Sequence, residues 1–113
     1  WGTGKPKREF LHVDDLAEAC LFLMNNYNEN SIINIGSEIE ISIIELAKLI
    51  KDIVGFDGEI EFDNSKPDGV MKKMMNSQKI RNLGWKPKIS LQDGIRDTYE
   101  WYSNNQTSVR NKK

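Results

Sequence analysis

The sequence predicts an α/β fold made of short strands and about four helices. Segments with apolar side chains at helical spacing alternate with short extended runs, in the order strand, helix, strand, helix, strand, short helix, helix. This order excludes a purely helical or purely β class and leaves α+β as the alternative arrangement. Of the 113 residues, 38% are hydrophobic and 29% are charged, which is the ordinary range for one soluble globular domain.

The first 27 residues predict a loop, a strand and a helix. Residues 1–8 contain two glycines, one proline and three basic side chains, which is a loop composition, and residues 9–13 offer a short extended run. Residues 14–27 carry apolar side chains at helical spacing. Asp14 and Asp15 stand where a helix N-terminus favours an acceptor and negative charge, so capping explains both without a metal site.

The middle of the chain predicts two strands on either side of the clearest helix. Residues 32–36 form an apolar run that ends at a glycine, and residues 59–63 alternate polar and apolar side chains as a half-buried strand does. Between them, Ser42 and Glu45 have the spacing of a capping box, and an apolar stripe leads to Gly55 as the C-terminal stop. We therefore expect a helix between Ser42 and Gly55.

The last third of the chain predicts a basic loop followed by two helices. Residues 64–73 are polar and basic, and a short helix over residues 77–82 can end at Gly84. A last helix begins near Ser90 and carries apolar and aromatic side chains on one face. The polar residues 105–113 are expected to form a frayed tail.

The global composition excludes several classes of function. Sixteen Lys and Arg against 17 Asp and Glu give a net charge of −1, which argues against binding to nucleic acid or to an anionic membrane. No apolar run approaches the roughly 20 residues needed to span a bilayer. The single cysteine, Cys20, excludes an intramolecular disulfide and a cysteine-based zinc cluster, and it fits a reducing cytoplasm.

Cys20 and His12 are weak candidates for chemistry. Cys20 lies in the apolar stripe of the first predicted helix, so we expect it to be a small buried side chain. His12 has no serine or cysteine nucleophile recognisably paired with it, so we interpret it as a structural residue.

Two loops concentrate positive charge and are candidates for an anion site. A diphosphate needs such a layout, because arginine grips it with two hydrogen bonds, lysine supplies a point charge, and loop N–H groups near glycine approach closely. A solvated surface is the alternative. The basic residues are Lys5, Lys7 and Arg8 in the first loop and Lys66, Lys72 and Lys73 in the second.

Two further residues of these loops are candidates for binding the uncharged part of a ligand. Trp1, beside two glycines, could offer a flat face to a sugar or a base, although most tryptophans pack in a core. Asp68, in Lys-Pro-Asp-Gly, could accept hydrogen bonds from a ribose or a base, or could only complete the turn. The Gly-Thr-Gly after Trp1 is not a dinucleotide fingerprint, because it follows no strand and opens no helix.

Three motifs follow one another in a recognisable order. Residues 1–17 match Trp-Gly-x-Gly-x-x-x-Arg-Glu-Phe-x-His-Val-Asp-Asp, residues 62–73 contain Ser-Lys-Pro-Asp-Gly with a lysine four residues later, and residues 83–101 run from Leu-Gly-Trp to Thr-Tyr-x-Trp. Together they resemble the GDP-L-fucose synthase family, whose members are GDP-4-keto-6-deoxy-mannose epimerase/reductases. That family belongs to the extended short-chain dehydrogenase/reductases of the NAD-dependent epimerase/dehydratase superfamily. The resemblance covers nearly the whole chain.

The resemblance implies a two-domain enzyme with an N-terminal Rossmann domain that binds NADP and a smaller C-terminal substrate domain. Residues 1–104 would be the C-terminal nucleotide-sugar-binding domain, in which residues 9–27 return to the Rossmann domain as a strand and a helix. The family's NADP loop and catalytic residues precede the segment that matches Trp1. The resemblance therefore implies a fragment that holds no catalytic, cofactor-binding or metal-binding residue. The full-length enzyme is expected to be a cytoplasmic homodimer.

The same resemblance assigns four residues to the GDP-sugar substrate. The positions matching Trp1 and Arg8 contact the GDP-sugar in that family. The loop that carries Asp68 and Lys73 closes over the ligand, with the lysine near the diphosphate. The resemblance thus favours a binding role for each of these four side chains.

Two departures from the family pattern leave the exact nucleotide sugar open. Asn76 stands where the family commonly has aspartate, and Lys72 stands where arginine is frequent, which keeps the charge but loses the forked geometry. An enzyme for a related nucleotide sugar such as a GDP-heptose is one alternative. A non-catalytic binding module that kept the fold is the other.

Overall fold

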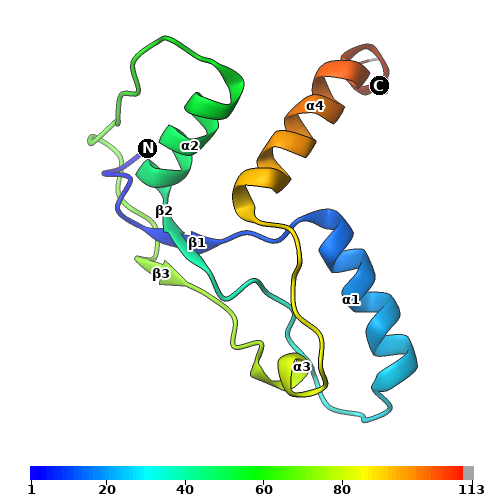
Figure 1. Ribbon diagram of the computed structural model, residues 1–113. Helices are drawn as coiled ribbons and strands as arrows, with labels where there is room; N and C mark the ends of the chain where they lie inside the picture. The colour runs from blue at the N-terminus through cyan, green and yellow to red at the C-terminus, as the bar shows by residue number, and fades with distance from the viewer. Residues whose placement is uncertain (111–113) are drawn as a thin grey trace.

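The computed structural model describes residues 1–110 and shows an α/β arrangement of three strands and four helices, as the sequence predicts (Figure 1). The strands meet on one side of the molecule, and α2 follows β2 without a loop. The elements in chain order are β1 Lys7–Glu9, α1 Val13–Asn26, β2 Glu40–Ser42, α2 Ile43–Val54, β3 Lys72–Lys73, α3 Gln78–Asn82 and α4 Leu91–Arg110.

The sheet is mixed, with β1 in the centre. Strand β1 pairs with β2 in the antiparallel direction and with β3 in the parallel direction. Arg8 stands opposite Lys73 on β3, and Lys7 stands opposite Lys72. Because directly paired residues share a face of a sheet and successive residues alternate, Arg8 and Lys73 lie on one face, and Lys7 and Lys72 lie on the other.

The predicted strands are placed wrongly. Neither residues 32–36 nor residues 59–63 form a strand, and the extended run expected over residues 9–13 becomes β1 slightly earlier, at Lys7–Glu9. A strand needs a second backbone to pair with, and within the described part of the chain these two runs have no ladder partner. Residues 32–36 serve packing instead, because Ile33 and Ile35 lie against the core.

The start of α1 is capped by a residue that the sequence did not indicate. His12 is the N-cap, and its Nδ1 accepts a hydrogen bond from the backbone N–H of Asp14 at 3.3 Å. Asp14 and Asp15 lie in the first turn as expected, but the expectation that they cap the helix is wrong. The carboxylate of Asp15 is buried and accepts from the backbone N–H groups of Lys88 and Ile89, both at 3.0 Å. Asp15 thus ties the start of α1 to the segment that leads into α4.

The expectation that Cys20 is buried is wrong, because its side chain is exposed. The apolar residues of α1 spread over more than one face of the helix. The face turned inward carries Asp15 and Ala19, and Phe22 and Leu23 pack partly against the core. Cys20 lies off this face, so a helical repeat alone does not decide which side of α1 is covered.

The other three helices begin where the sequence predicts. The capping box of α2 is present, because Ser42 Oγ accepts from the Glu45 N–H and Glu45 Oε2 accepts from the Ser42 N–H at 3.0 Å. Gly55 ends α2 with φ 69°. Helix α4 continues to Arg110, into the segment expected to be a frayed tail, and residues 111–113 lie outside the described residues.

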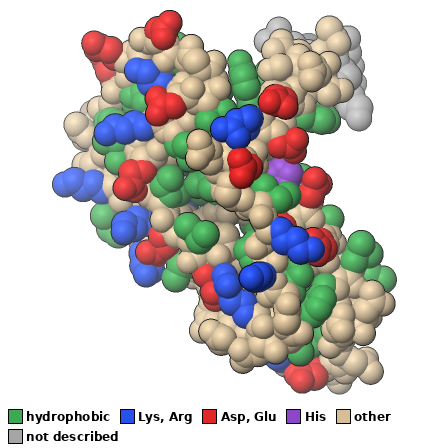
Figure 2. Space-filling model, in the orientation of Figure 1, with side chains coloured by type: hydrophobic (Ala, Val, Ile, Leu, Met, Phe, Trp, Pro, Cys, Tyr) green, Lys and Arg blue, Asp and Glu red, His purple; other side chains and the backbone are tan. Residues whose placement is uncertain are grey.

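The buried apolar core of the described chain is small. Ala19, Ile80 and Trp85 form it, and five half-buried residues pack around them. A second apolar region is an open cavity of about 420 Å³ between α2 and α4. In the described chain, the helices are too short or too polar to cross a membrane. Charged and hydrophobic side chains share the visible surface (Figure 2).

Candidate functional site

The two basic loops predicted from the sequence come together beside the sheet. The Gly2 N–H donates to the carbonyl of Asp63 at 2.9 Å, and the Lys7 N–H donates to the carbonyl of Met71 at 2.8 Å. Figure 1 shows the N-terminal segment running alongside the chain that leads into β3. The first loop and residues 62–73 therefore lie side by side. We call the surface formed by residues 1–5, residues 62–71, Arg8 and Lys73 the basic face.

Asp68 links the two loops. Its Oδ1 accepts from the Thr3 N–H at 2.8 Å, and its Oδ2 accepts from the Thr3 hydroxyl at 2.7 Å. A Cβ at Gly2 would lie 2.2 Å from Oδ1, and Gly2 has φ +70°, so only glycine suits this approach. The Thr3 hydroxyl and then the Thr3 N–H lower the pKa of Asp68, with a smaller contribution from the positive charge of Lys5.

Trp1 stands at the rim of the basic face. Its side chain is 87% exposed, so the ring does not belong to the core. The ammonium group of Lys66 lies 5.9 Å from the ring centroid, which is within the range of a cation–π contact. This contact joins the two loops a second time and leaves most of the indole open to solvent.

Arg8 lies at the base of the same surface and is half-buried. Its Nη1 donates to the carbonyl of Val70 at 2.7 Å and to the carbonyl of Lys7 at 2.6 Å. The guanidinium also lies against Gly69, where an added Cβ would be 3.3 Å from Nη2. Arg8 is thus held against the second loop by backbone contacts that leave its charge unpaired with any carboxylate of the described chain.

Lys72 and Lys73 are neighbours in sequence but differ in their surroundings. Lys72 Nζ lies 2.9 Å from Glu40 Oε1, an ion pair across the sheet on the face opposite Arg8. Lys73 shares the face of Arg8, is exposed, and forms no ion pair with a residue of segment 1–110. The register therefore leaves Lys73, and not Lys72, available to a ligand next to Arg8.

All four residues expected at the site lie on this basic face or at its rim. Thr3 and Lys66 also belong to it, and sequence reasoning missed the part that each plays. A threonine between two glycines gives no pattern that predicts an aspartate partner 65 residues away. The sequence indicated Lys66 only as one of the positive charges of its loop. Its contact with the Trp1 ring depends on how the two loops meet.

Another cluster of polar side chains joins α1 to α4. His12 Nε2 lies 3.2 Å from Asp97 Oδ2, and with Asp14 the three residues bring ligand-type atoms within 4.8 Å of one another. Figure 2 shows the histidine in purple with acidic side chains beside it. Both ring nitrogens are already used, one to cap α1 and one to contact Asp97, so the structure supports the structural role expected for His12.

Residues 1–36 match the model of the NAD dependent epimerase/dehydratase family. Putative GDP-L-fucose synthase 2 of Arabidopsis thaliana is 56% identical over 105 residues, which are 93% of this chain and 32% of the relative. A GDP-L-fucose synthetase structure from Naegleria fowleri has a TM-score of 0.87 at 34% identity and matches 94% of this chain and 33% of that one.

A GDP-6-OMe-4-keto-L-xylo-heptose reductase structure from C. jejuni has a TM-score of 0.84 at 47% identity. The match covers 93% of this chain and 33% of that chain. The chain thus spans about a third of the length of the relatives it matches. It belongs to the NAD dependent epimerase/dehydratase family.

Proposed function

We propose that this chain is the GDP-sugar-binding portion of an NADP-dependent epimerase/reductase that converts GDP-4-keto-6-deoxy-mannose to GDP-L-fucose. The observation that carries the proposal is the basic face, where Arg8 and Lys73 share one side of the sheet without carboxylate partners in the described chain. The similarity to a GDP-L-fucose synthase and to a GDP-heptose reductase supports the choice of ligand.

Each residue of the site has a distinct task in this proposal. Arg8 and Lys73 neutralise the diphosphate, since both offer charged donors on one face. Trp1 packs on the sugar-phosphate region with its exposed ring. Asp68, an anionic acceptor already fixed by Thr3, takes hydrogen bonds from hydroxyl or N–H groups of the nucleoside.

The chain itself does not fit NADP. A dinucleotide loop places its glycines between a strand and the N-terminus of a helix, which then faces the pyrophosphate. Here Gly2 and Gly4 are followed by the strand β1 and not by a helix, and the backbone of Gly2 already packs closely against Asp68. We therefore assign the cofactor and the catalytic residues to the rest of the full-length protein, and no catalytic role to this chain.

The domain boundaries belong to the same proposal. Residues 1–104 form the nucleotide-sugar-binding domain, and residues 9–27 return to a Rossmann domain of the full-length enzyme. Exposed apolar side chains on α1 support such a contact, because Val13, Leu21 and Met24 are 68%, 62% and 80% exposed. We also propose that the full-length enzyme is a homodimer in the cytoplasm.

Titration with GDP tests the site. Lys73→Ala should weaken GDP binding about tenfold, because it removes a charged hydrogen bond worth about 1.5 kcal/mol. Lys72→Ala is the matched control and should change the affinity less than about twofold, since that lysine lies on the other face of the sheet, where it pairs with Glu40. Tryptophan fluorescence and amide chemical shifts report the binding.

Two results would contradict the proposal. Millimolar GDP that leaves the amides of residues 1–8 and 66–73 unchanged rules out a self-sufficient site in this chain. Equal losses for Lys72→Ala and Lys73→Ala rule out the face-specific contact. In the full-length enzyme, Lys73→Ala should raise the KM for the GDP-sugar more than Lys72→Ala does. This comparison tests the site in the presence of the rest of the protein.

A GDP-heptose enzyme is the second candidate. The 47% identity to the C. jejuni heptose reductase favours it. The two departures from the family pattern do not decide between the sugars, because Lys72 pairs with Glu40, and Asn76 Oδ1 accepts from the Gln78 N–H at 3.0 Å at the start of α3. Turnover of GDP-4-keto-6-deoxy-mannose against a GDP-4-keto-heptose by the full-length protein distinguishes them, and a protein inactive on both supports a non-catalytic module.

A further inference from the structure

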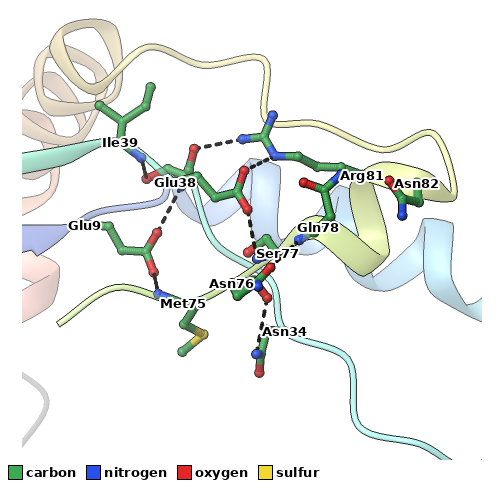
Figure 3. A network of polar contacts seen from close by, with 11 residues as sticks. Glu9, Asn34, Glu38, Ile39, Met75, Asn76, Ser77, Gln78, Arg81 and Asn82 are labelled. Atoms are coloured by element: carbon green, nitrogen blue, oxygen red, sulfur yellow. Dashed lines mark hydrogen bonds and ion pairs between the residues drawn. The ribbon is translucent and has the colours of Figure 1, made fainter.

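Glu9 directly follows Arg8 in β1, but its side chain lies on the opposite face of the sheet and is half-buried. Its Oε1 accepts from the Met75 N–H at 2.7 Å, and its Oε2 accepts from the Glu38 N–H at 3.0 Å. Figure 3 shows this carboxylate between the two backbone segments. One side chain of β1 thus holds both the segment before β2 and the segment after β3.

The segment before β2 is shaped to receive this carboxylate. A Cβ at Gly36 would lie 2.8 Å from Glu9 Oε2, so only glycine leaves the room that Glu9 needs. Glu38 has φ 58°, a left-handed conformation that costs free energy for a residue with a side chain. The hydrogen bond from its N–H to Glu9 helps to hold this conformation.

A second carboxylate extends the network to α3. Glu38 Oε1 accepts from the Ser77 N–H at 2.9 Å, and Glu38 Oε2 forms an ion pair with Arg81 Nε. Arg81 also donates from Nη2 to the carbonyl of Ser37 at 3.0 Å. The chain that leaves β3 is therefore fixed at Met75 by Glu9 and at Ser77 by Glu38 (Figure 3).

This anchoring matters because β3 is very short. It consists of Lys72 and Lys73 alone, and a ladder of two residues does not fix a strand by itself. Met75 comes two residues after Lys73, and Arg8 comes immediately before Glu9. The Glu9 carboxylate consequently sets where the backbone of Lys73 lies relative to the backbone of Arg8.

We propose that Glu9 is a positioning residue that holds Lys73 beside Arg8 so that both cations reach one diphosphate. This inference rests on the proposed function, because it assumes that Arg8 and Lys73 bind that group. Glu9 itself does not touch the ligand, since its side chain lies on the other face. A purely structural Glu9 would stabilise the fold without any particular dependence on Lys73.

A double-mutant cycle on GDP affinity separates the positioning role from the structural one. Glu9→Gln keeps the size of the side chain but turns one acceptor oxygen into a donor that cannot accept from an N–H. It should raise the Kd for GDP about fivefold when Lys73 is present and less than about twofold in the Lys73→Ala background. Glu29→Gln is the matched control, because Glu29 joins a loop to Lys79 on α3 without contacting the basic face, and it should leave the Kd unchanged.

The outcomes are distinguishable. The inference is overturned if Glu9→Gln reduces the affinity for GDP equally with and without Lys73. It is also overturned if Glu9→Gln leaves the affinity unchanged while Lys73→Ala weakens binding. Both results leave the proposed function intact. Wild-type protein that does not bind GDP, or Lys73→Ala without effect, overturns both. If circular dichroism shows that Glu9→Gln does not fold, Glu9→Asp replaces it in the cycle, because it keeps the charge with a shorter reach. Glu9→Asp should then show a smaller loss with the same dependence on Lys73.

Discussion

Asp68 shows how one ionised side chain joins two loops that are far apart in the sequence. Both of its oxygens accept hydrogen bonds from Thr3, and the Thr3 hydroxyl is the main cause of its lowered pKa. Because the folded-state pKa lies below the ordinary 3.8, the stabilisation that this link contributes is complete above that value and is lost as the pH falls through the folded pKa. The charged form of Asp68 that makes this link is therefore present at neutral pH and is lost only in acid.

Removing the Thr3 hydroxyl tests this cause. Thr3→Ala should shift the pKa of Asp68 upward toward 3.8, as measured by following the carboxyl carbon in an NMR titration. The pKa of Asp93 is the internal control, because the Ser90 hydroxyl lowers it in the same way on α4, and it should not change. An unchanged pKa of Asp68 in Thr3→Ala would show that another group holds its charge.

Among the elements, α2 is stabilised at its N-terminus by the capping box of Ser42 and Glu45. Ser42 Oγ accepts from the Glu45 N–H, and the Glu45 carboxylate closes the box on the Ser42 N–H. Ser42→Ala should lower the free energy of unfolding by about 1 kcal/mol, because it leaves a helix N–H without its acceptor. Urea denaturation followed by circular dichroism measures the loss. Ser103→Ala, on an exposed turn of α4, is the matched control and should be neutral or slightly stabilising, since alanine favours a helix interior.

Local chemistry explains which elements the sequence could predict. The start and end of α2 follow from Ser42, Glu45 and Gly55, whose effects act within a few residues of each other. Strands depend on distant partners, and nothing in Lys72–Lys73 itself indicates that this pair would be β3. Apolar pattern alone placed a strand over residues 32–36, where the chain instead packs two side chains on the core.

The same distinction between local and distant interactions applies to the site. Motifs predicted that Trp1, Arg8, Asp68 and Lys73 act together, and the structure brings them to one surface. Lys72 and Lys73 lie on opposite faces of the sheet because of the register of β1 with β3. No local sequence signal predicts that register. The link from Asp68 to Thr3 likewise depends on how two loops meet.

Considered as a whole, the molecule is open and poorly covered. Its radius of gyration is 17.0 Å, whereas a compact domain of this length has about 13 Å. The described residues bury three apolar side chains in one cluster, and large apolar side chains such as Leu21, Met24 and Ile32 remain 62%, 80% and 91% exposed. A chain of this shape retains apolar surface that other molecules can reach.

This surface predicts how the isolated chain responds to two kinds of substitution. Leu21→Gln with Met24→Gln should reduce the fluorescence of the apolar dye ANS and change the free energy of unfolding by no more than about 0.5 kcal/mol, because both side chains already contact water. Ile80→Ala should cost about 2–5 kcal/mol, because Ile80 is fully buried in a cluster with Ala19 and Trp85, and should raise ANS binding. Urea denaturation and dye titration of the three proteins measure both effects. If the double substitution on α1 destabilises the chain as much as Ile80→Ala does, then α1 packs its outer side chains within this chain, which contradicts the proposed contact of α1 with a Rossmann domain.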